Sequence, residues 1–109
     1  MININGENWR VVMVSPHHPQ LWIDYENKYA LGVCDDIRKT IYINDDVPDK
    51  LLKKILAHEL THAAMFSYNV PLGHEEEEVI ADLIATYGQE IIENTNIIFR
   101  RIKEKREDV

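Results

Sequence analysis

The sequence predicts an α+β fold in a single domain, residues 1–109, with the strands first and the helices after them. Two patterns predict it. Residues 1–45 contain short runs rich in β-branched side chains, whereas residues 46–105 repeat apolar side chains at helical spacing. The length of 109 residues fits one domain, and 45% apolar with 28% charged residues is typical of a globular chain.

Strand-like stretches follow one another within residues 1–45. Residues 9–14 are rich in valine, and residues 21–33 alternate partly between apolar and polar side chains. Residues 39–44 form a clear short strand that is closed by Asn44-Asp45-Asp46. We expect these stretches to build a small antiparallel or mixed sheet at the N-terminal end of the chain.

A first helix is predicted for residues 46–69. Asp46 or Val47 can cap its start, and Pro48 suits the first turn, where its missing N–H costs little. Its apolar side chains cover more than one stripe, so we expect the helix to be buried on most sides. They are Leu51, Leu52, Ile55, Leu56, Leu60, Ala63 and Phe66.

A second helix is predicted for residues 74–105, with acidic residues in its first turn that suit the helix dipole. Unbroken, it would be about 46 Å long at roughly 1.5 Å per residue, longer than so small a domain spans. We therefore expect a break or bend near residues 94–96. Its apolar stripe, or the mixed-charge tail at residues 95–109, offers a surface for self-association or a protein partner.

The first helix carries the strongest chemical motif, His58-Glu59-Leu60-Thr61-His62. Residues four apart on a helix lie one above the other, so both imidazoles project to one side and can supply half of a tetrahedral Zn²⁺ site. Glu59 can reach a water on the metal and take its proton. An incidental pair of helix histidines is the alternative, but apolar flanks make uncompensated burial of three polar residues costly.

A third metal ligand is expected from the second helix. Glu78 and Asp82 lie one turn apart on one face, so Glu78 can close the metal site while Asp82 accepts an N–H from a ligand histidine. His74, just before the helix, and Glu77 are the competing ligands.

The motif together with Glu78-Val79-Ile80-Ala81-Asp82 resembles the gluzincin arrangement of zinc metallopeptidases, and within it small ImmA/IrrE-type or phage-encoded metallopeptidase-like proteins. The resemblance covers residues 39–90 and implies a minimal zincin-like fold, a sheet packed on an active-site helix and a second helix. It implies that His58, His62 and Glu78 bind Zn²⁺, that Glu59 is the general base, and that Asp82 orients a histidine. The strand at residues 40–44 would lie beside the active-site helix, as an edge that pairs with a peptide or as an interior strand.

The function we expect is a zinc-dependent metallopeptidase that hydrolyses a peptide bond through a zinc-activated water. The alternative is a non-catalytic zinc-binding module that binds a protein partner. Cys34 could act as an inhibitory thiolate, although a buried, inert cysteine is the simpler interpretation. Nothing in the sequence selects the group that stabilises the oxyanion. The candidates are Tyr68, Tyr87, His74, His17 and His18.

Composition narrows the expected partners and compartment. A net charge of −7 argues against a general nucleic-acid binder. Apolar runs are too short to cross a membrane, and residues 1–6 lack the pattern of a signal peptide. With its one cysteine, these features favour a cytoplasmic protein that acts on peptides or proteins.

Overall fold

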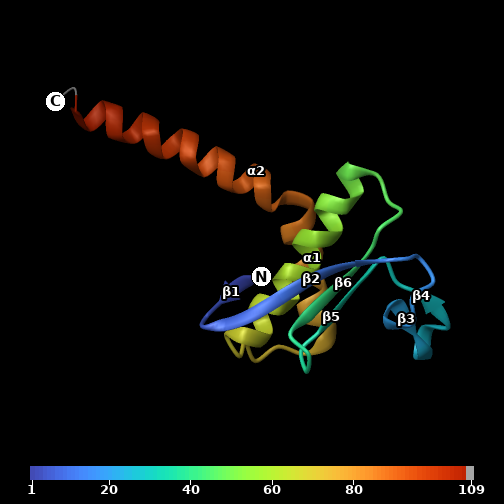
Figure 1. The fold of residues 1–109 in the computed structure, drawn as a ribbon. Coiled ribbons are helices and arrows are strands. Elements are labelled where there is room, and N and C mark those ends of the chain that lie inside the picture. The colour runs from blue at the N-terminus through green and yellow to red at the C-terminus, as the bar shows by residue number, and fades with distance from the viewer. Residues whose placement is uncertain (108–109) are drawn as a thin grey trace.

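A four-stranded mixed sheet forms the N-terminal part of the molecule in the computed structural model, which describes residues 1–107 (Figure 1). The strands lie in the order β1 (Ile2–Ile4), β2 (Glu7–Val14), β6 (Thr40–Asn44) and β5 (Gly32–Asp35). β2 and β6 are parallel, and the two outer strands run antiparallel to their neighbours. Two helices follow in sequence, so the predicted α+β class with a small mixed sheet is confirmed.

β1 and β2 form a hairpin that our sequence analysis missed. Asn5 and Gly6 connect the strands, and both have positive φ angles, 49° and 82°. A two-residue turn of this kind matches the right-handed twist of the strands, and Asn-Gly is the dipeptide that favours it. The turn pairs Ile4 with Glu7 and so extends the sheet by one strand.

The strand-like stretch at residues 21–33 is not one continuous strand. The chain forms a 3₁₀ turn (Pro19–Leu21), β3 (Trp22–Ile23), a second 3₁₀ turn (Asp24–Glu26) and β4 (Lys28–Tyr29). It reverses at Asn27, whose left-handed φ of 51° is incompatible with a continuous strand. β3 and β4 then pair antiparallel as a small ribbon beside the main sheet (Figure 1).

β6 is an interior strand, because β2 and β5 pair with its two sides. Ile41 and Ile43 point to one face of the strand and are completely buried. They form the core with Trp9 from β2 and with Ile55 and Ala63 from the first helix. The edge role for residues 40–44 is therefore excluded, and β5 takes the end of the sheet instead.

The first helix, α1, spans Asp49–Ser67, slightly less than the predicted residues 46–69. Pro48 is its N-cap rather than part of its first turn. The helix ends because Asn69 adopts a left-handed conformation (φ 53°), which lets the N–H of Val70 donate to the Met65 carbonyl (2.9 Å). Burial is less complete than expected, since Leu51 and Phe66 each remain 38% exposed.

The second helix, α2, spans His74–Glu107 and runs back along α1 before its later turns leave the body of the molecule (Figure 1). The break expected at residues 94–96 is absent, because the helix continues through them; a bend within the unbroken helix stays a prediction. The molecule is consequently elongated, with principal extents of 61 × 31 × 27 Å. No helix in residues 1–107 combines the length and apolarity needed to cross a membrane.

Candidate metal centre

Two imidazoles and one carboxylate converge where α1 and α2 pack together. His58 and His62 lie one turn apart on α1, with their Nε2 atoms 3.1 Å from each other. The carboxylate of Glu78, from the second turn of α2, reaches both: its oxygens lie 3.3 Å from His58 Nε2 and 2.9 Å from His62 Nε2. These three residues are the group in the described chain whose donor atoms could hold one metal ion, all lying within 4.8 Å of one another.

Two further carboxylates contact the outer nitrogens of the same rings. Asp82 Oδ1 lies 3.0 Å from His58 Nδ1, and His62 Nδ1 lies 2.6 Å from Glu77 Oε1. Asp82 thus contacts a histidine as the sequence analysis expected. Glu77, which that analysis weighed only as a competing ligand, is the matching partner of His62. A carboxylate on one ring nitrogen fixes the tautomer and aims the other nitrogen at a metal.

The chemistry of this donor set fits a divalent cation. If each ring is neutral and carries its proton on Nδ1, where a carboxylate lies within hydrogen-bond distance, both Nε2 atoms present lone pairs to each other and to Glu78. Three acceptors facing one another are unfavourable unless a positive charge lies between them. Their separations of 2.9–3.3 Å are close to the spacing of about 3.3 Å that tetrahedral bonds of about 2.0–2.1 Å would set.

Glu59 lies beside these donors without belonging to them. Its side chain is buried, and its Oε1 lies 4.0 Å from His58 Nε2. Burial raises the pKa of the Glu59 carboxyl above its ordinary value; His62 and His58 oppose this, and the charge of Glu78 adds to it. A carboxylate with a raised pKa, held next to a cation site, is suited to accept and return a proton.

Comparison with known protein families shows which family this chain belongs to. The family model of the IrrE N-terminal-like domain, a peptidase family, matches residues 12–100, from β2 to well into α2. The chain belongs to this family. The IrrE-type likeness predicted from the motif is therefore confirmed, and it extends beyond the expected residues 39–90. No curated protein and no solved structure gives a significant match.

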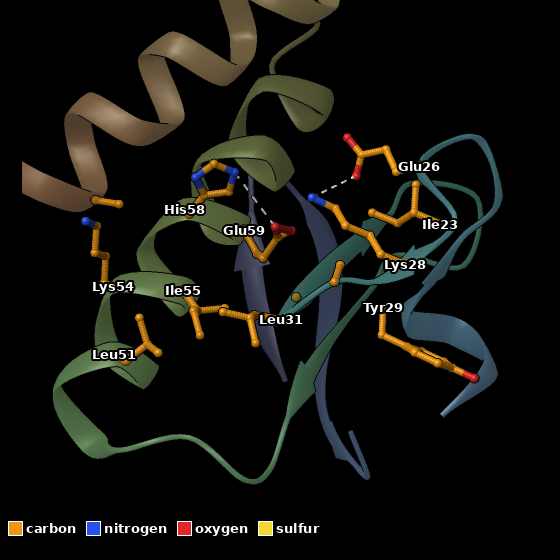
Figure 2. A pocket seen from close by; sticks show the side chains of 13 residues that line it. Ile23, Glu26, Lys28, Tyr29, Leu31, Leu51, Lys54, Ile55, His58 and Glu59 are labelled. Atoms are coloured by element: carbon orange, nitrogen blue, oxygen red, sulfur yellow. Dashed lines mark ion pairs between the residues drawn. The ribbon is translucent and has the colours of Figure 1, made fainter. Parts of the chain in front are cut away.

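In this IrrE-like domain, two pockets of about 390 and 380 Å³ meet at Glu59. Glu59, Gly32 and Ile23 line both pockets. The first lies between α1 and the β3–β4 ribbon. Figure 2 shows His58 and Glu59 at one end of it, Leu51 and Ile55 from α1 on one side, and the ribbon residues on the other. The second pocket continues past His62 and Glu78. The two together form a cleft on both sides of Glu59, along β5.

The structure shows which of the other candidate ligand and oxyanion-binding residues of the IrrE-like chain lie near the metal cluster. His74 lines the second pocket but lies outside the three-residue cluster, and Tyr68, Tyr87, His17 and His18 line neither pocket. The two loop histidines have structural contacts: His17 packs edge-on against Tyr29, and His18 accepts the Gln20 N–H at a 3₁₀ N-terminus. Sequence analysis missed Tyr25 and Tyr29, which line the cleft, because only the ribbon at residues 22–29 brings them there.

Cys34 lines the second pocket from β5 but is not part of the metal cluster. Burial raises the pKa of its thiol strongly, and the nearby charges of Glu59 and Asp36 raise it further. A thiol in such surroundings stays protonated at neutral pH, and the thiol form is a poor metal ligand and a poor nucleophile. These surroundings favour an inert cysteine over an inhibitory thiolate.

Proposed function

We propose that this chain is a zinc-dependent metallopeptidase of gluzincin type, in which His58, His62 and Glu78 hold Zn²⁺ and Glu59 is the general base. One observation carries the proposal. The two Nε2 atoms and the Glu78 carboxylate converge on one point, and the buried Glu59 carboxylate lies beside it where two pockets meet.

Three acidic residues of the chain have different roles in the proposed reaction. Glu59 takes a proton from the attacking water at its carboxylate and returns that proton to the leaving amine. Asp82 and Glu77 hold the Nδ1 protons of His58 and His62 and so keep both Nε2 atoms directed inward. A zinc ion held there supplies Lewis acidity, which polarises a carbonyl and lowers the pKa of a water molecule.

The cleft supports a peptide as the substrate. β5 is the last strand of the four-stranded sheet, and it borders both pockets through Gly32. An extended peptide can pair with such a strand, which would place its side chains alternately toward and away from the pockets. Leu51, Ile55 and Leu31 form an apolar part of the wall of the pocket between α1 and the ribbon, and this part suits an apolar side chain next to the scissile bond.

A non-catalytic zinc module that binds a partner is the second candidate. A structural zinc site is closed by four protein ligands, whereas a catalytic site keeps one position open. Among residues 1–107, the cluster offers three ligating side chains, with His74 outside it. The three-ligand count favours catalysis.

The substitution Glu59→Gln tests the proposal. The variant should bind Zn²⁺ as well as wild type, because Glu59 is outside the donor set, but should lose about 10²–10⁴-fold in the rate of peptide cleavage. Zinc binding is measured by competition with a chromophoric chelator, and cleavage with a quenched fluorescent peptide library.

The matched control is Glu76→Gln, which changes an exposed carboxylate on α2 and should alter neither measurement. Equal cleavage by wild type and Glu59→Gln would reject Glu59 as the base. Zinc-loaded wild type that cleaves no peptide in the library would favour the non-catalytic module.

A further inference from the structure

A groove of about 800 Å³ lies on the opposite flank of α1 from β5, between its first turns and the middle of α2. It adjoins the cleft, since Lys54 and Ala85 line both the groove and the first pocket. Lys50 and Lys53 of α1 line it on one side, and Ile84, Ile91 and Ile92 of α2 line it on the other.

One wall of the groove is positively charged. Lys50, Lys53 and Lys54 follow one another along the first two turns of α1, and all three are exposed. None of them has an ion-pair partner among the described residues, and no acidic residue lines the groove there. The chain as a whole has a net charge of −7, so this wall carries a local charge opposite to that of the molecule.

The other wall is apolar and exposed. Ile84, Ile91 and Ile92 on α2 have 43%, 54% and 60% of their surfaces open to solvent. The same face continues along the projecting part of the helix, because Ile98 and Phe99 follow Ile91 and Ile92 at a spacing of seven residues. Apolar residues repeated every seven positions on one helix are the pattern that packs against a second helix, and exposed apolar surfaces of this kind mark binding sites.

We propose that this groove binds an amphipathic helix of another protein, with its apolar face on Ile84, Ile91 and Ile92 and acidic side chains against Lys50 and Lys53. The charges argue against a second copy of this chain as the occupant. The part of α2 that could supply an apolar face, residues 91–102, carries Glu93 as its one acid against Arg100 and Arg101. Pairing it with the lysine wall would bring like charges together.

The test uses two synthetic helical peptides that share a leucine face and differ only in flanking residues, glutamate in one and lysine in the other. Binding is measured by fluorescence anisotropy of labelled peptide. Wild type should bind the glutamate peptide at least tenfold more tightly at low salt, and the preference should shrink as salt screens the charges. The double variant K50E/K53E should prefer the lysine peptide.

Two further variants separate the walls of the groove. Ile91→Ser should weaken the glutamate peptide severalfold while leaving the fold intact by circular dichroism, because Ile91 is an exposed residue. K103E/K105E, which changes exposed lysines beyond the groove, should leave binding unchanged.

Several outcomes would overturn the proposal. Equal affinity for both peptides, or an unchanged preference in K50E/K53E, would show that the lysine wall does not select the partner. A dimer in sedimentation equilibrium that excludes the glutamate peptide would assign the face to a second copy. Adsorption to phosphatidylserine vesicles without peptide binding would assign it to a membrane surface.

Discussion

Glu77 shows how much a single side chain adds to the candidate metal centre. It is one of four consecutive glutamates, Glu75 to Glu78, and composition alone gives each the same role at a helix N-terminus. In the structure, successive residues on α2 point in directions about 100° apart. Glu78 consequently reaches both Nε2 atoms and Glu77 reaches His62 Nδ1, whereas Glu75 and Glu76 are exposed.

The substitution Glu77→Ala should therefore lower the affinity for Zn²⁺ about 10–100-fold, because His62 loses the carboxylate that fixes its tautomer. Glu78→Ala should lower it further, since it removes a donor. Competition with a chromophoric chelator measures both, and Glu76→Ala is the control with an exposed carboxylate. An affinity for Glu77→Ala equal to that of Glu76→Ala would remove Glu77 from the centre.

Gly32 makes a second prediction for a single residue. A Cβ at this position would lie 2.8 Å from Ile55 Cγ2 and 3.0 Å from Glu59 Cγ, so β5 approaches α1 as closely as a glycine permits. Gly32→Ala should cost about 1–3 kcal/mol of the free energy of unfolding through overpacking, measured by urea denaturation. It should also slow peptide cleavage, because the methyl group presses on the side chain of the proposed base.

Gly73→Ala is the control for this prediction, because a Cβ there meets no atom within 4 Å. Its free energy of unfolding should stay within about 1 kcal/mol of wild type. If Gly32→Ala is as stable and as active as Gly73→Ala, the close approach of β5 to Glu59 is not a constraint on the site.

At the scale of elements, the sheet supports α1 through its interior strand. β6 contributes Ile41 and Ile43 to the core, and Ile55 and Ala63 of α1 pack on the same cluster. Trp9 links β2 to the end of α1, because its indole N–H donates to Ser67 Oγ (2.7 Å) at the last turn of the helix. The helix that carries the candidate ligands thus packs on the core through Ile55 and Ala63 and is bonded to β2 at Ser67.

Ile43→Ala should accordingly destabilise the fold by about 2–5 kcal/mol, the usual cost of truncating a fully buried aliphatic side chain. Val11→Ala on β2 is the comparison, since Val11 is 41% exposed and its loss should cost less than about 1 kcal/mol. Urea denaturation of both variants measures the difference. Similar costs for the two would contradict the assignment of the core to this face of β6.

The later part of α2 differs from the sequence prediction, because the helix runs unbroken from His74 to Glu107. We expected a break because an unbroken helix would outgrow the domain. Asparagine and threonine cost a helix less than about 1 kcal/mol each, too little to end it. The Thr95 hydroxyl also donates to the Ile91 carbonyl (2.7 Å), which occupies the polar side chain within the helix. The helix therefore continues and extends past the body of the molecule.

For the molecule as a whole, the candidate metal centre would link two helices that already pack against each other and are connected by the short segment at residues 68–73. A cation held by His58 and His62 from α1 and Glu78 from α2 would bind the folded state and not the unfolded chain. Zn²⁺ at a hundredfold excess over its Kd should then add about 2.7 kcal/mol to the free energy of unfolding.

In a domain of this size, that gain raises Tm by ~10 °C or more. Thermal unfolding followed by circular dichroism, with added Zn²⁺ and then with excess chelator, measures the shift. Glu78→Ala should lose most of it, because only α1 would still hold the ion. A Tm that ignores both zinc and chelator would contradict a metal shared by the two helices.

The sequence by itself determined the elements with strong local patterns. It predicted α1 with its paired histidines, an acidic start for a second helix, and the strand at residues 40–44, because the spacing of apolar and polar residues within one element is a local property. The sequence also indicated Glu78 and Asp82 as candidate site residues on one face of the second helix. In the structure, Glu78 contacts His62 and Asp82 contacts His58.

Only the tertiary structure decided how these elements meet. The rotation of α2 against α1 assigned Glu77 to His62, the pairing of β6 with two neighbours left β5 at the end of the sheet, and the reversal at Asn27 built the ribbon that walls the cleft. It also left the apolar face of α2 exposed. These outcomes depend on contacts between residues far apart in the chain, and the periodicity of one segment carries no information about its neighbours in space.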